Sequence, residues 1–150
     1  MNDFAKSLMD KSLAFAVRIA KLAQFLCDET KEFVLSRQIV RSGTSIGANV
    51  REAQFAQSDM DFISKLSIAL KEASETQYWL EVLAKAEYIT EKQYFSLRND
   101  ADRLVGLLVK AIKSKKRNLG LPPPRSQVDN SPNRKTDYEI PLTPTSPLTL

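Results

Sequence analysis

The placement of proline divides this sequence into two regions. All seven prolines of the 150-residue chain lie after residue 120, whereas residues 1–117 contain no proline and only three glycines. Proline blocks helix formation, and a proline-free segment rich in Ala, Leu, Lys and Glu favours helices. We therefore expect one helical domain over residues 1–117 and a disordered tail, rich in Pro, Ser and Thr, over residues 118–150.

Apolar residues recur every three or four positions in four segments of the first region. This spacing predicts four amphipathic helices, over about residues 4–27, 31–57, 59–86 and 91–116. Ser58 or Asp59 is the expected N-cap of the third helix, and Thr90 with Gln93 has the form of a capping box. The third helix is expected to bury Phe62, Leu66, Ala69, Leu70, Ala73, Gln77, Leu80 and Ala84. Short connections between such helices predict an all-α fold, an antiparallel up-down-up-down four-helix bundle.

The residue types that most enzymes use are scarce in this chain. It has no histidine, which removes the usual general base and the commonest metal ligand. Its one cysteine, Cys27, allows neither an internal disulfide nor a zinc cluster. An alternative is a carboxylate pair of Glu52 and Glu75, or a metal site that also uses Glu32 and Glu72. Because bundles that bind two metal ions also use histidine, we expect no enzyme activity, no cofactor and no metal.

The apolar segments of the chain are interrupted by charges. No stretch approaches the roughly 20 apolar residues that span a membrane. The N-terminal segment carries Asp3, Lys6, Asp10 and Lys11, whereas a signal peptide needs an unbroken apolar centre. The sequence therefore predicts a cytoplasmic protein without a membrane partner.

Five polar residues of the second helix are spaced like residues that face a neighbouring helix. They are Gln38, Ser42, Ser45, Asn49 and Glu52. An apolar row runs beside them, made of Leu35, Ile39, Ile46, Val50 and Ala53. A polar row next to a buried row belongs at the edge of a helix–helix interface, where each polar group needs a partner. Gly43 and Gly47 lie among these residues and would let a second helix approach closely.

The third helix has more apolar surface than one core needs. At about 100° per residue, Ile68, Trp79 and Val82 lie roughly opposite Leu66 and Ala73, with Leu83 near them. A tryptophan on an outer face is typical of a protein–protein interface. These residues predict self-association, unless the bundle's twist or the N-terminal segment covers them.

Two basic clusters could contact phosphates. Arg37, Arg41 and Arg51 share a stripe of the second helix. A second cluster lies towards the end of the fourth helix and consists of Lys110, Lys113, Lys115, Lys116 and Arg117. Both clusters could bind RNA or DNA. The arginines could equally pair with Glu72 or Glu75 of a neighbouring subunit, and either cluster could simply be solvated.

The segments SRQIVRSGTSIGANVREAQ and FISKLSIALKEASETQYWLEVL resemble the family of 23S rRNA intervening-sequence proteins. The residues that carry the resemblance are Gln38, Ser45, Ile46, Asn49 and Glu52, followed by Leu66, Ser67, Ile68, Ala69 and Glu75. The resemblance implies an antiparallel four-helix bundle that assembles as a homopentamer. In it, Gln38, Ser45, Asn49, Glu52 and Glu75 form a polar stripe that specifies packing. The chain is also similar to retroelement accessory proteins, which associate with a reverse transcriptase and nucleic acid.

These observations lead to one functional hypothesis and one alternative. The hypothesis is a non-enzymatic, homo-oligomeric accessory or scaffold protein that binds RNA or DNA through its basic clusters. The alternative is a protein-interaction module that recruits a partner through the Trp79 face or the proline-rich tail.

Overall fold

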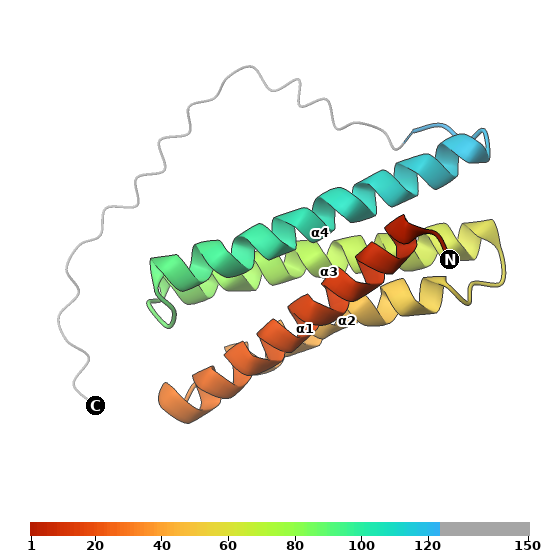
Figure 1. Ribbon diagram of the computed structural model, residues 1–150. Coiled ribbons are helices and arrows are strands. Elements are labelled where there is room, and N and C mark those ends of the chain that lie inside the picture. Colours follow the sequence, from red (N-terminus) through yellow and green to blue (C-terminus); the bar gives the residue numbers. More distant parts are fainter. Residues whose placement is uncertain (124–150) are drawn as a thin grey trace, which may run out of the picture.

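The computed structural model describes residues 1–123 of the chain (Figure 1). The elements are α1 (Asp3–Glu29), α2 (Leu35–Ala53), α3 (Asp59–Lys85) and α4 (Glu91–Asn118). All regular elements of the described part are helices, so the predicted all-α fold is confirmed. Most of the predicted tail, residues 124–150, lies outside the described residues.

The four helices pack in chain order, each antiparallel to the one before it. α2 packs against both α1 and α3, and α3 packs against α4. α1 and α4 are also in contact, but less extensively than the other three neighbouring pairs. In Figure 1, α1 crosses the bundle obliquely and its C-terminal end lies away from α4. The bundle is therefore antiparallel up-down-up-down as predicted, and it is least tightly closed between its first and last helices.

The core is formed by large apolar residues from all four helices. The largest fully buried ones are Phe15, Ile19 and Leu26 in α1, Ile39, Ile46 and Val50 in α2, Leu66, Leu80 and Leu83 in α3, and Leu104 and Leu108 in α4. Burying one such side chain contributes about 1.5–3 kcal/mol relative to leaving it exposed. The core therefore lies along the shared axis of the bundle.

Side-chain caps mark the starts of three helices. Asn2 accepts a hydrogen bond from the backbone of Ala5, and Ser58 accepts one from Asp61. Thr90 and Gln93 exchange both hydrogen bonds of a capping box. The predicted caps of the third and fourth helices are thus confirmed.

The second helix is shorter than predicted, because it runs over Leu35–Ala53 instead of about 31–57. Lys31 adopts a left-handed φ of 54°, which cannot continue a helix. The Glu32 carboxylate accepts hydrogen bonds from the backbone N–H groups of Val34, at 3.0 Å, and Ser36, at 2.8 Å. Glu32 thereby caps α2 from outside it.

The buried side of α3 differs from the predicted stripe. Ile63, Thr76 and Leu83 are buried, although none was placed in that stripe and Leu83 was placed near the outer face. Four residues of the predicted stripe are only half-buried, namely Phe62, Leu70, Gln77 and Ala84. α3 lies between α2 and α4, so its buried side must face two helices and is broader than one stripe.

Candidate nucleic-acid interface

The polar row of α2 lies at the edge of its interface with α3. At its centre, the hydroxyls of Ser42 and Thr76 are fully buried and lie 2.9 Å apart. Nearer the surface, Glu52 forms an ion pair with Lys65 at 2.7 Å. Every buried side-chain nitrogen or oxygen within residues 1–123 has a hydrogen-bond partner. The expectation that the buried polar groups of this row find partners is therefore confirmed.

The remaining residues of the row bond locally or lie at its margin. The Ser45 hydroxyl donates to the carbonyl of Arg41 at 2.6 Å, and the Asn49 amide donates to that of Ser45 at 2.8 Å. Gln38 is half-buried. These bonds stay within α2, so Ser42 is the row's buried polar link to α3.

The Arg41 guanidinium forms ion pairs with two carboxylates of the same chain, on α3. It lies 3.3 Å from Glu72 and also pairs with Glu75. The indole N–H of Trp79 donates to Glu75 at 3.1 Å. The hydrogen bonds from Arg41 and Trp79 lower the pKa of Glu75, and the bond to Glu75 raises the pKa of Arg41. The charge of Arg41 is therefore already matched within the bundle.

Arg37 and Arg51 are exposed and make no ion pair with any residue of the described part. They are 14 positions apart on α2, which places them about 21 Å apart along the helix axis. Since Arg41 is engaged between them, the three arginines do not form one continuous cluster of unmatched charge.

The C-terminal half of α4 carries a continuous basic surface. Residues 103–118 contain six Lys and Arg residues and no Asp or Glu. Four of these, Lys110, Lys113, Lys116 and Arg117, line a shallow hollow of about 720 Å³ around Gly106. We call these four residues the α4 basic face. None of them forms an ion pair with any of residues 1–123, so the positive charge of this surface is unmatched within the described part.

Lys115 lies beside this face but is engaged elsewhere. Its ammonium is 2.5 Å from the Asp59 carboxylate and 5.4 Å from the centre of the Phe62 ring. Arg103 was missed from the sequence, although it precedes Lys110 by seven positions and so lies on the same side of α4. That spacing was the signal that would have found it.

Each carboxylate considered for catalysis or metal binding is engaged by another group of the chain. Glu32 caps α2, Glu52 pairs with Lys65, and Glu72 and Glu75 hold Arg41. No group of three potential metal ligands occurs within residues 1–123. Among the helices of this part, none combines the length and the apolar character needed to cross a membrane.

The predicted oligomer face is only partly exposed. Ile68 is 38% exposed, whereas Val82 and Trp79 are half-buried and Trp79 packs against its own core. Larger exposed fractions occur on α1, with 53% for Leu13 and 47% for Val17. On α3, Met60 and Tyr78 are 59% and 57% exposed, so both α1 and α3 carry exposed apolar side chains.

Residues 6–110 match the family model described as 23S rRNA-intervening sequence protein. The chain belongs to this family. It is also similar to a solved structure from Bacteroides thetaiotaomicron VPI-5482, described as a protein with unknown function from the S23 ribosomal protein family. The two are 60% identical with a TM-score of 0.73, and the match covers 73% of this chain and 98% of the other. No curated protein matches the chain.

Proposed function

We propose that this family member is a non-enzymatic, homo-oligomeric accessory protein that binds the phosphate backbone of RNA or DNA through the α4 basic face. The observation that carries the proposal is the charge of residues 103–118, with six basic and no acidic residues. Cations of this kind attract a polyanion, and each phosphate that they neutralise releases counterions.

The geometry of the face supports backbone binding. Lys110, Lys113 and Arg117 follow one another at steps of three and four along α4, so their side chains project from the same side. Gly106 lies before Lys110 and lines the hollow of the α4 basic face. No other residue comes within 4 Å of the position that its Cβ would take. A row of cations beside a hollow can contact several phosphates of a curved strand, whereas a single small anion would contact only part of the row.

The test is a binding titration of the full chain with a fluorescently labelled 20-nucleotide single-stranded RNA over a salt series. The variant K113E/K116E/R117E should bind far more weakly. Its plot of log affinity against log salt concentration should lose a slope of about 2, because three phosphate contacts are removed.

A matched control separates the site from overall charge. The variant K21E/K71E/K92E changes the net charge equally at three exposed lysines that make no ion pair within residues 1–123. It should retain most of the affinity and the slope. Equal losses in both variants, or no salt-dependent binding by the unmodified chain, would reject the proposed site and favour a protein-interaction module.

A further inference from the structure

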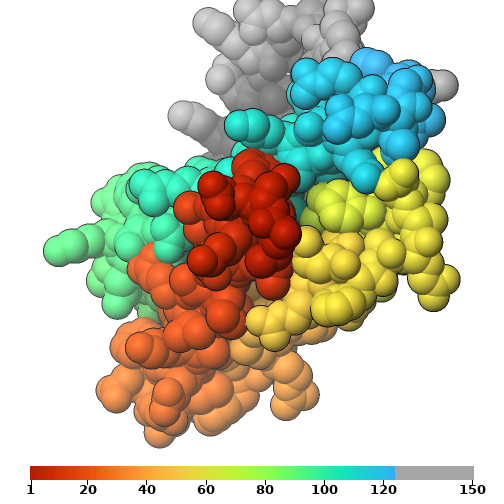
Figure 2. Space-filling view, turned by 45° about the vertical axis from the view of Figure 1, so that its right-hand side comes forward, coloured from red at the N-terminus to blue at the C-terminus, as the bar shows by residue number. Residues whose placement is uncertain are grey.

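We infer that a pocket beside the α4 basic face accepts one unpaired base of the bound strand, an inference that rests on the proposed function. The pocket lies where the start of α1 meets α3, the C-terminal half of α4 and the end of α2. Figure 2 shows the start of α1 between that part of α4 and the α2–α3 end of the bundle. The volume of the pocket, about 500 Å³, is within the range of small-molecule sites.

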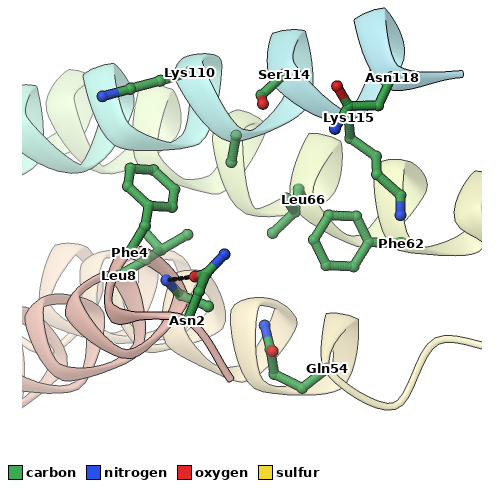
Figure 3. A pocket seen from close by; sticks show the side chains of 12 residues that line it. Asn2, Phe4, Leu8, Gln54, Phe62, Leu66, Lys110, Ser114, Lys115 and Asn118 are labelled. Atoms are coloured by element: carbon green, nitrogen blue, oxygen red, sulfur yellow. Dashed lines mark hydrogen bonds between the residues drawn. The ribbon is translucent and has the colours of Figure 1, made fainter.

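Two aromatic rings form the sides of this pocket. Phe4 from α1 and Phe62 from α3 are half-buried and, with Leu66, face a common space (Figure 3). A nucleic-acid base is flat and apolar on its faces and stacks on such rings whatever its identity. The rings therefore fit the face of a base.

A cation accompanies each ring. The Lys110 ammonium lies 5.5 Å from the centre of the Phe4 ring, and that of Lys115 lies 5.4 Å from the centre of the Phe62 ring. Lys110 lines both this pocket and the hollow of the α4 basic face. A strand that follows the α4 basic face therefore reaches the pocket without a gap in positive charge, which favours a nucleotide over an uncharged apolar occupant.

Side-chain amides border the pocket. Asn2 uses its carbonyl oxygen to cap α1, at 2.8 Å from the Ala5 nitrogen, which leaves its NH₂ group to donate. Gln54 and Asn118 also border the pocket, and both are exposed. Such amides pair with the edge of a base only when that edge is not already paired. The pocket therefore selects an unpaired base rather than a duplex.

The test compares two 12-nucleotide single strands of equal length and backbone charge. One has a base at every position and the other is abasic at every position, so that no shift of register can supply a base. The full chain should bind the intact strand roughly 5- to 150-fold more tightly, the range expected for one stacked base. The F4L variant, which keeps apolar packing without an aromatic face, should remove that difference, and F4W should restore it.

The outcomes separate this inference from the proposed function. If both strands bind equally well, and the slope of the salt dependence falls in K113E/K116E/R117E, the base pocket is rejected while backbone binding stands. That result would leave the pocket to an apolar peptide or lipid chain. If neither strand binds, both the pocket and the proposed function are rejected. If F4L weakens both strands equally, Phe4 acts only in folding and the inference fails.

Discussion

Gly43 lies where α2 packs closely against Ile19 of α1. A Cβ atom built on Gly43 would lie 2.7 Å from Cγ2 and 2.9 Å from Cγ1 of Ile19, which is fully buried. Isoleucine is stiff about its first side-chain torsion, so Ile19 cannot move aside without disturbing the core. Glycine lowers the stability of a helix by about 1 kcal/mol relative to alanine. At position 43 this loss accompanies the close packing of α2 against Ile19.

We predict that G43A destabilises the protein and that G106A stabilises it. Overpacking against Ile19 costs about 1–3 kcal/mol and outweighs the gain in helix propensity. Gly106 has no atom within 4 Å of its Cβ position, so alanine there gains about 0.5–1 kcal/mol. Urea denaturation of both variants measures the two free energies of unfolding. Stabilisation by both substitutions would show that α1 and α2 do not pack this closely.

Glu75 links stability to pH. Its pKa lies below the usual 4.5 because Arg41 and Trp79 hold the ionised form. Between the folded and unfolded pKa values the unfolded chain binds more protons, so the free energy of unfolding falls as pH falls. This contribution is complete above about pH 4.5 and is lost as pH drops through the folded pKa.

The E75Q variant should therefore be less stable than the unmodified protein at pH 7 and should differ less from it at pH 3. Denaturation at the two pH values measures this change. E29Q is the control, because Glu29 is exposed and makes no ion pair within residues 1–123. An equal destabilisation by E75Q at both pH values would mean that Glu75 contributes through packing alone.

At the scale of elements, the start of α2 depends on one side chain. Desolvation raises the pKa of Glu32, but hydrogen bonding by the backbone N–H groups at the start of α2 outweighs it and leaves that pKa below its usual value. The N-cap position itself, Val34, provides no side-chain cap. Glu32 therefore does the work that Ser58 and Thr90 do for α3 and α4.

We predict that E32A destabilises the protein by about 0.5–2 kcal/mol, the usual cost of losing a helix cap. Amide hydrogen exchange should accelerate at Val34 and Ser36, where two bonds are lost, and much less at the C-terminal end of α2. E29A removes a nearby carboxylate that caps nothing and is the matched control. Equal acceleration in both variants would contradict the capping role.

Local signals made most elements predictable from the sequence. The capping residues Ser58 and Thr90 and the apolar spacing of α4 depend on neighbours in the chain, so they identify helices without tertiary information. The start of α2 was missed because a glutamate three positions before a helix is not a recognised cap. The Thr76–Ser42 contact was missed because it depends on how α3 lies between two helices.

The site was less predictable than the fold, for a related reason. Spacing placed Arg41 in a basic stripe, but its engagement by Glu72 and Glu75 depends on the packing of α2 against α3. The cluster at the end of α4 could be recognised because its excess charge is local in sequence. Its nearness to Phe4, from the opposite end of the described chain, could not.

At the scale of the whole molecule, we expect copies of the chain to associate through α1 and α2. Leu13 and Val17 are about half-exposed. Beside Leu13, the small residues Gly47 and Ala48 of α2 help to line a hollow of about 340 Å³. Apolar side chains next to a hollow with small walls suit the entry of side chains from a second copy.

We predict that L13E/V17E lowers the oligomer mass measured by light scattering and leaves the helical circular dichroism unchanged. The matched variant I68E places a charge on the face of α3 that the sequence favoured, and it should leave the mass unchanged. The opposite result would locate the interface on α3, and a monomeric unmodified chain would reject self-association.

The contact between α1 and α4 is the least extensive between neighbouring helices of the bundle, and the contact between α2 and α3 is the most extensive. Arg18 of α1 links the two helices, because it forms an ion pair with Asp100 at 2.6 Å and donates a hydrogen bond to the Ser96 hydroxyl at 2.9 Å. A nucleic-acid strand bound to α4 and a second copy of the chain bound to α1 would each contact one side of this helix pair. Any free energy by which one binding event favours closure of the α1–α4 contact is a coupling free energy that the other binding event shares equally. Oligomer assembly would then strengthen strand binding by the same factor by which strand binding strengthens assembly.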